Sequence, residues 1–252
     1  MTEQTLLESN QTILEHLNDL RVRLTWAVVG LAVATAVSFA FTEPLLNFII
    51  APYGEQLQTL SPTEGIQTYF RVALVSGAIL SMPWMLFQFW KFISPGLHKS
   101  EKRYVFIFVP AAFLLFLTGV SFAWFVLLPA AINFLSTFLP GVFSPEWTSN
   151  EYIGFATTFL FWLGVSFEMP LIVYFVARFG LVSSKTLRQQ WRFAIVGIAI
   201  VAAAVTPSID PITMILTMVP LIVLYGLSIL LARLGQGQFE RAMALNAEKE
   251  SS

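Results

Sequence analysis

A single carboxylate stands in the middle of a long apolar run, within the stretch Gly164–Pro170 (Gly-Val-Ser-Phe-Glu-Met-Pro). Glu168 is the only charged residue between Tyr152 and Ala177. Ten residues separate it from Arg178, where the run ends. In a helix that rises ~1.5 Å per residue, the carboxylate therefore lies ~15 Å deep, near the middle of a ~30 Å hydrocarbon layer.

An acid at this depth points either to function or to a helix contact. Acidic and basic side chains at the centre of a membrane cost roughly 2.5–3.5 kcal/mol, so Glu168 is expected to face a partner, a neighbouring helix or water rather than lipid. We favour a functional site, since ionisable groups inside membranes are usually functional. The alternative is a protonated glutamate that hydrogen-bonds across a helix contact and only holds helices together.

Two further acids lie on a surface that is otherwise basic. Glu101 lies within the basic run 99–103, and Asp19 lies close to Arg21 in an amphipathic segment. A guanidinium binds a carboxylate through two parallel hydrogen bonds, so two acids could recognise two adjacent arginines. Simpler interpretations remain open: Glu101 can favour a helix N-terminus, and Asp19 can pair with Arg23 four residues on.

The composition assigns the chain to membrane proteins and excludes several other classes. Hydrophobic residues make up 56% and charged residues 12%, against roughly 25% charged in soluble domains. The absence of cysteine excludes disulfides, thiolate metal sites and a cysteine nucleophile. Neither a P-loop nor an HExxH pattern is present, so we expect no enzyme, no metal and no cofactor. The net charge of −1 gives no general attraction to nucleic acid.

The apolar runs predict an all-α integral membrane protein with six transmembrane helices. An amphipathic helix over Gln11–Leu24 is expected to lie at the membrane surface before the first span. A mixed loop is expected over Glu43–Ile66. The fifth and sixth helices are expected to be short, the fifth because its apolar run covers only ~20 Å of helix. The expected spans are Leu24–Thr42, about Ser61–Phe92, Val105 to about Leu139, about Ser149–Ala177, Phe193–Val205 and Ile212 to about Ala232.

Local signals mark the starts of several helices and the places where others bend. Pro110 and Pro129 predict kinks or tilt in the third span. The starts are indicated by capping boxes at Ser61–Glu64 and Thr148–Glu151, by a serine cap at Ser183 or Ser184, and by Asp210-Pro211 before the sixth helix.

The basic residues predict the orientation. With six crossings, every lysine and arginine except Arg71 falls on the face that holds both termini. Short loops rich in lysine and arginine stay in the cytoplasm, so we expect both termini to be cytoplasmic. The expected organisation is an amphipathic segment over 1–23, a six-helix membrane domain over 24–233 and a polar, frayed cytoplasmic tail over 234–252.

Four segments, in order and in agreement with this topology, resemble the TatC family, the six-span subunit of the twin-arginine protein translocase. The resemblance runs from about His16 to Arg233. The segments are His16–Leu24 (His-Leu-Asn-Asp-Leu-Arg-Val-Arg-Leu), Phe92–Leu97 (Phe-Ile-Ser-Pro-Gly-Leu) followed by Glu101, Gly164–Pro170, and Thr206-Pro207 with Asp210-Pro211 and Pro220-Leu221.

This resemblance implies a curved, glove-shaped helical bundle that binds the signal peptides of folded export substrates on its cytoplasmic face. It implies signal-peptide contacts at Asp19, Arg21, Phe92, Pro95 and Glu101. Glu168 would meet the signal peptide or a partner helix in a concave cavity, and Thr206 and Thr213 match a region where partner helices dock. The chain departs from the family in two places: relatives usually have glutamate at the position of Asp19, and many have glutamate where this chain has Gly226.

The implied function is that of a non-enzymatic core receptor subunit in a prokaryotic plasma (inner) membrane. The implied partners are single-span TatA/TatB-type proteins, membrane lipid and twin-arginine signal peptides, in a complex with several copies and with export driven by the proton gradient. The alternatives are a small-solute or ion secondary transporter and an intramembrane hydrolase. A transporter would typically show more polar groups at membrane depth and repeat symmetry, and a hydrolase would need a second catalytic group beside Glu168.

Overall fold

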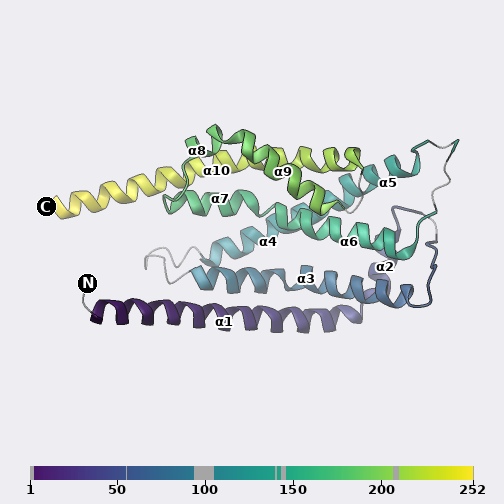
Figure 1. The fold of residues 1–252 in the computed structure, drawn as a ribbon, viewed down its shortest axis with the longest axis horizontal. Helices are drawn as coiled ribbons and strands as arrows, with labels where there is room; N and C mark the ends of the chain where they lie inside the picture. Colours follow the sequence, from purple (N-terminus) through teal and green to yellow (C-terminus); the bar gives the residue numbers. More distant parts are fainter. Residues whose placement is uncertain are drawn as a thin grey trace. The chain divides into compact units, whose positions relative to one another are not determined.

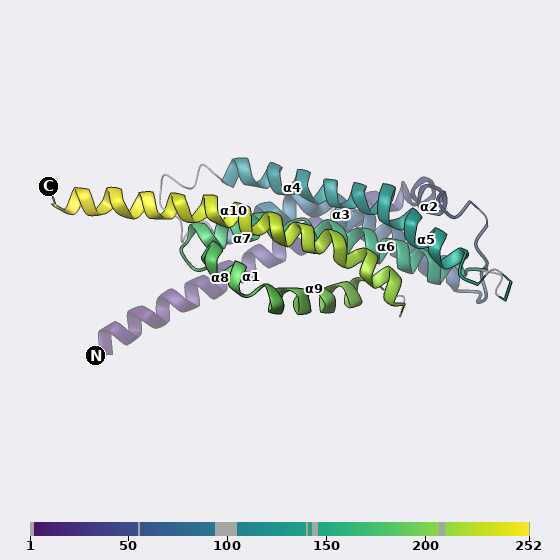
Figure 2. The ribbon, with the colours of Figure 1, turned by 90° about the horizontal axis from the view of Figure 1, so that it is seen from above.

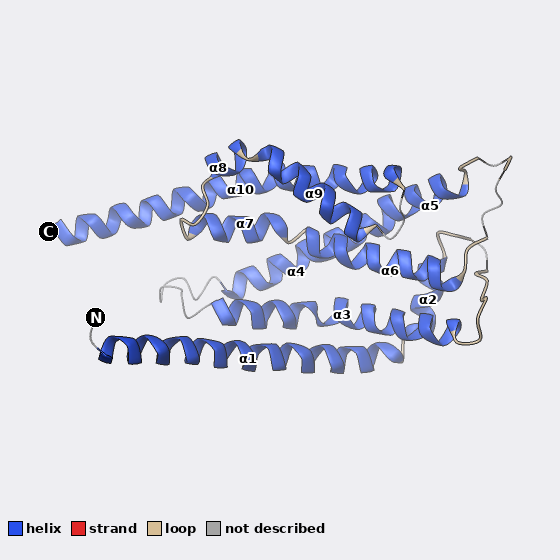
Figure 3. Cartoon of the chain, viewed as in Figure 1, coloured by secondary structure: helices blue, strands red, loops and turns tan. Residues whose placement is uncertain are grey.

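A computed structural model describes residues 3–54, 56–93, 105–139, 141–142, 146–206 and 210–251 (Figure 1). Nearly all of these residues are helical, and no strand longer than an isolated bridge occurs among them (Figure 3). The helical elements are α1 (Glu3–Phe39), α2 (Thr42–Ile50), α3 (Glu64–Ile93), α4 (Val105–Phe122), the π-helical turn η3 (Ala123–Leu127), α5 (Leu128–Ser136), α6 (Ser149–Ser166), α7 (Met169–Arg178), α8 (Ser184–Gln189), α9 (Trp191–Val205) and α10 (Pro211–Ser251).

Five stretches are long and apolar enough to cross a membrane: His16–Phe39, Glu64–Phe92, Phe108–Ser136, Ser149–Arg178 and Pro211–Gln238. A shorter apolar helix, α9, adds a sixth membrane helix. This confirms the prediction of an all-α protein with six membrane helices. The fifth of them is short, as predicted, because α9 has only 15 residues.

The chain divides into two compact units, which we describe separately: residues 1–47 with 69–114, and residues 48–68 with 115–252. In the first unit α1 packs against α3. The indole N–H of Trp84 donates to the carbonyl of Trp26 at 2.8 Å. A side chain at Gly77 would come within 2.5 Å of Thr35, so a glycine is needed where the two backbones approach. Helix α1 continues unbroken from Glu3 to Phe39, so the predicted amphipathic segment and the first span form one helix.

In the second unit, proline and glycine determine how the third and fourth spans pack. Pro129 lies in the first turn of α5, directly after η3. A proline ring removes a helical hydrogen bond and crowds the preceding turn, which explains the irregular turn at this point. A side chain at Gly164 of α6 would come within 2.7 Å of the fully buried Phe116. Helices α4 and α6 are therefore in close contact at this glycine.

The sixth membrane helix differs from its predicted length. Helix α10 has 41 residues and extends to Ser251, so it is not short, and no break separates the apolar part from the predicted tail. It runs alongside α7 (Figure 2). The N–H of Thr213 donates to Asp210 Oδ1 at 2.6 Å, which confirms Asp210-Pro211 as the helix start. Polar side chains hold the extension: Arg178 donates to Gln238 Oε1 at 2.6 Å.

The predicted loop after the first span is more ordered than expected. It contains α2, and Gln58 forms a parallel bridge with Thr148. The Tyr152 hydroxyl donates to the Ile49 carbonyl at 2.9 Å, which fixes α6 to the end of α2. The expectation of a mixed loop missed this order, because these contacts join residues about 90 or more positions apart.

Candidate functional site

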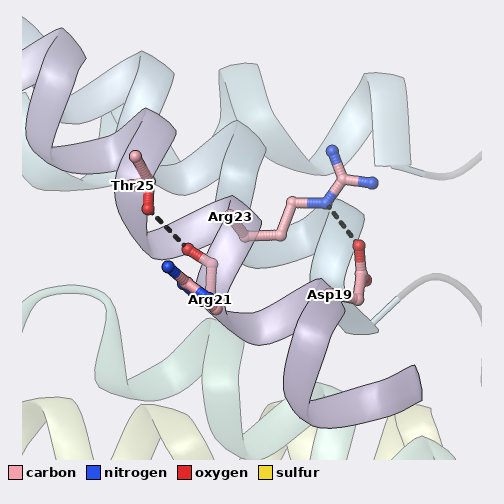
Figure 4. Close-up of polar contacts among 4 residues, drawn as sticks. All are labelled: Asp19, Arg21, Arg23 and Thr25. Carbon is pink, nitrogen blue, oxygen red and sulfur yellow. Dashed lines mark hydrogen bonds and ion pairs between the residues drawn. The ribbon is translucent and has the colours of Figure 1, made fainter. Parts of the chain in front are cut away.

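Two of the predicted signal-peptide contacts, Asp19 and Arg21, lie on α1 (Figure 4). Asp19 Oδ1 is 3.2 Å from Arg23 Nε, and the two side chains are 30% and 22% exposed. This is the i,i+4 pair that the simpler interpretation of Asp19 anticipates. Arg21 is exposed and its carbonyl accepts from the Thr25 hydroxyl at 2.8 Å. The stretch therefore carries one carboxylate and two guanidinium groups, of which Arg21 is exposed and the Asp19–Arg23 pair is partly exposed.

Phe92, at the end of α3, contacts this stretch through an aromatic stack. Its ring centroid lies 4.7 Å from that of His16, with 29° between the ring planes. His16 precedes Asp19 by about one helical turn, so the stack holds the Asp19 region beside the end of α3. The remaining predicted residues of this group, Pro95 and Glu101, lie outside the described residues.

Glu168 lies at a break in the fourth span. Helix α6 ends at Ser166, and Pro170 lies in the first turn of α7. The Glu168 carbonyl accepts from the N–H groups of Leu171 and Ile172, so the backbone of Glu168 opens the second helix. The side chain is 5% exposed, and Oε1 has no hydrogen-bond partner among the described residues.

The two residues beside Glu168 hold this break in place. Phe167 and Met169 pack against a buried cluster formed by α9 and α10 (Ile198, Ala202, Leu221 and Leu224). On α4, a side chain at Gly119 would come within 2.7 Å of the Phe167 ring. The break is thus fixed by the apolar packing of the residues on either side of Glu168, and Oε1 has no partner among the described residues.

Thr206 and Thr213, the predicted partner-helix contacts, are both buried, at 4% and 1% exposure. The Thr206 hydroxyl donates to the Ala202 carbonyl at 2.8 Å. The Thr213 hydroxyl has no partner among the described residues, although its carbonyl accepts from Thr217 at 2.9 Å. In the described structure these threonines therefore face protein, and a docking helix would have to reach them by displacing that cover.

One polar residue has a larger structural role than sequence analysis gave it. Glu64 is 5% exposed, and its Oε2 accepts from the Leu60 N–H at 2.8 Å. Its Oε1 accepts from the Asn150 N–H at 2.8 Å and the Ser149 hydroxyl at 3.4 Å. The capping box predicts the contact with Ser61, which is present at 3.4 Å, but not the contact with the start of α6.

Comparisons with known proteins identify the family of this chain. The family model "Sec-independent protein translocase protein (TatC)" matches residues 15–220. The TatC protein of Deinococcus radiodurans is 37% identical over 92% of this chain and 91% of its own length. The TatC protein of Helicobacter pylori strain 26695 is 37% identical over 87% of this chain and 86% of its own length.

A solved structure supports the same assignment. The crystal structure described as "Twin Arginine Translocase Receptor- TatC" is 31% identical and superposes with a TM-score of 0.80, covering 87% of this chain and 99% of that one. These names describe a translocase and not an enzyme, in agreement with the expectation from the sequence. The chain therefore belongs to the TatC family and is a multi-pass membrane protein that forms the core subunit of the twin-arginine translocase.

Proposed function

We propose that this chain captures the twin-arginine signal peptides of folded proteins on its cytoplasmic face. In this proposal both termini are cytoplasmic, single-span TatA/TatB-type partners assemble with the chain in several copies, and the proton gradient drives export. The signal peptide binds where α1 meets the end of α3. The observation that carries the proposal is the partly exposed Asp19–Arg23 pair on α1, held beside the end of α3 by the His16–Phe92 stack.

The geometry of this pair suits exchange for an incoming guanidinium. The contact uses one carboxylate oxygen and one Arg23 nitrogen. Partly exposed pairs of this kind contribute only about 0–1 kcal/mol, so little is lost when the pair opens. A signal-peptide arginine that binds both oxygens in parallel makes a stronger, more directional contact. Arg23 would then hold the carboxylate in place until the signal arrives.

The second arginine of the signal needs a second acid, for which we propose Glu101. Segment 94–104 follows the end of α3 and carries both Pro95 and Glu101. Phe92, two residues before this segment, stacks on His16 of α1, which supports the proposal that the segment supplies the second acid. Two carboxylates supplied by two parts of the chain would favour paired arginines over paired lysines, because lysine cannot form the two-pronged contact.

Glu168, Thr206 and Thr213 are proposed to meet the signal peptide or partner helices. Oε1 of Glu168 and the hydroxyl of Thr213 are buried without a partner among the described residues. A buried polar atom without a partner costs roughly 1–3 kcal/mol, so a polar group on an arriving helix would be stabilised there. This supports recruitment by hydrogen bonding within the membrane.

Site-directed photocrosslinking of a twin-arginine signal peptide tests the recognition surface. We expect Asp19→Asn and Glu101→Gln each to lower the crosslinking yield about tenfold or more, since a charge-assisted pair contributes roughly 1.5–3 kcal/mol. Asp19→Glu, which restores the usual family residue, should keep most of the yield. Glu151→Gln, an exposed acid in the first turn of α6, is the matched control. Unchanged crosslinking in both test variants would reject this recognition surface.

A further inference from the structure

The region around helix α8, between α7 and α9 in the second unit, has no part in the proposed signal-peptide site. It carries four exposed cations: Lys185 and Arg188 on α8, Arg192 at the start of α9, and Arg233 on α10. None of them forms an ion pair within the described part of the chain. A group of like charges without internal neutralisation is available for an anionic ligand.

Hydrogen bonds fix α8, which carries two of these cations, on α10, which carries a third. Gln236 Oε1 accepts from the N–H and the hydroxyl of Ser184, at 3.2 and 3.3 Å. The Tyr225 hydroxyl donates to the Leu187 carbonyl at 2.6 Å. Arg233 precedes Gln236 by three residues, so it lies on the same side of α10 as the residue that binds α8. The α8–α9 turn is thus a fixed basic surface.

Large apolar side chains are interleaved with the cations. Leu181, Trp191 and Phe193 are 75%, 51% and 79% exposed. The Arg192 guanidinium lies 5.8 Å from the centroid of the Trp191 ring. Basic residues with aliphatic stems beside an exposed tryptophan are typical of the boundary between headgroups and acyl chains. This mixture favours a lipid over a soluble anion or an acidic protein surface, which would leave the apolar side chains in water.

The length of α9 gives an independent reason for lipid to approach here. Its 15 residues span only ~22 Å at ~1.5 Å per residue, against a ~30 Å hydrocarbon layer. A short membrane helix is accommodated by local thinning of the bilayer and by flanking side chains that reach the interface. Thinning at the start of α9 would bring headgroups close to Arg192.

We propose that Lys185, Arg188, Arg192 and Arg233 form a binding site for the headgroup of an anionic phospholipid. The guanidinium groups donate hydrogen bonds to the lipid phosphate, and Trp191 and Phe193 lie against the upper acyl chains. The site goes beyond the proposed signal-peptide function, because it uses neither Asp19 nor Glu168. It would fix the bilayer around the shortest membrane helix of the described chain.

Native mass spectrometry of the purified chain tests the site, with phosphatidylglycerol and phosphatidylcholine of identical acyl chains as probes. Each basic residue near an anionic surface contributes roughly fivefold. We therefore expect Arg188→Gln/Arg192→Gln to lower the affinity for phosphatidylglycerol about tenfold or more and to leave phosphatidylcholine binding unchanged. Arg188→Lys/Arg192→Lys should keep most of the preference. The matched control is Arg71→Gln/Lys91→Gln, which removes two exposed cations from α3.

Three results would overturn the proposal. The first is a wild-type preference for phosphatidylglycerol in the Arg188→Gln/Arg192→Gln chain. The second is an equal loss in the α3 control, which would mean a general charge effect. The third is a parallel loss for both lipids. Circular dichroism checks the fold, and if the double variant does not fold, the single variants decide the question with an expected loss of about threefold to fivefold each.

Discussion

Replacing Glu168 with alanine is expected to lower export of a folded twin-arginine substrate at least tenfold while signal-peptide binding survives in part. The carboxyl group is 5% exposed at the α6–α7 break, and its Oε1 has no partner among the described residues. If an arriving helix supplies that partner, alanine removes the hydrogen bond between them. Each ~1.4 kcal/mol lost in this way lowers binding of the helix about tenfold. Transport into membrane vesicles and crosslinking of a TatA/TatB-type partner measure the two steps separately.

The control for Glu168 is a nearby polar residue whose hydrogen bond is already satisfied. The Ser166 hydroxyl donates to the Trp162 carbonyl at 2.8 Å, so Ser166→Ala should leave export close to wild type. Glu168→Gln keeps a hydrogen-bonding side chain of the same size and should retain more activity than Glu168→Ala. Wild-type export by Glu168→Ala would leave only the structural interpretation, in which the acid holds helices together.

The second large effect is expected on stability, from Glu64→Ala. One carboxylate accepts hydrogen bonds from two neighbouring N–H groups before α3 and from the N–H of Asn150 and the hydroxyl of Ser149 at α6. Its removal leaves these donors without their acceptor and weakens the attachment of the loop to the start of α6. We expect the midpoint of thermal unfolding in detergent to fall by about 5 °C or more.

Glu151→Ala is the comparison for this loss, because Glu151 is also an acid at a helix start but is exposed. Its removal should lower the unfolding midpoint by only about 1 °C, as expected for an exposed acid in a first helical turn. Glu64→Gln should be nearly as unstable as Glu64→Ala, since an amide has one acceptor oxygen in place of two. Equal midpoints for Glu64→Ala and Glu151→Ala would show that the four contacts of Glu64 contribute little.

Features encoded over a few residues could be predicted from the sequence. The side chain of Ser183 accepts from the Thr186 N–H at 3.0 Å, and that of Thr148 from the Glu151 N–H at 3.2 Å, as the predicted caps require. The short α9 follows from a run of apolar residues bounded by Arg192 and Thr206. Such signals are local, because a cap or an apolar run needs no knowledge of distant residues.

Features that depend on distant residues were missed. The contact of Glu64 with Asn150 joins residues 86 positions apart, and no periodicity marks it. Helix α10 continues past Arg233, where Gln236 and Gln238 find partners on α8 and α7, whereas composition alone predicts a frayed tail. The break at Glu168 is visible only as Pro170, and prolines elsewhere, such as Pro220, lie inside unbroken helices.

The candidate site was predictable by residue type but not by arrangement. The acid Asp19 and its neighbour Arg23 were identified from charge and spacing, and the structure pairs them. The stack of His16 on Phe92 was not predicted, because it joins two residues that lie 76 positions apart on different helices. The partners proposed for Asp19 and Glu168 are side chains of other proteins, which neither this sequence nor this fold contains.

Binding of one signal peptide in two versions tests the capture of paired arginines most directly. The wild-type chain, purified in detergent, is incubated with an immobilised twin-arginine signal peptide or with the same peptide carrying two lysines. The account predicts at least about tenfold greater recovery on the arginine version, because two carboxylates each form a two-pronged contact that lysine cannot make. Equal recovery on both peptides would contradict it.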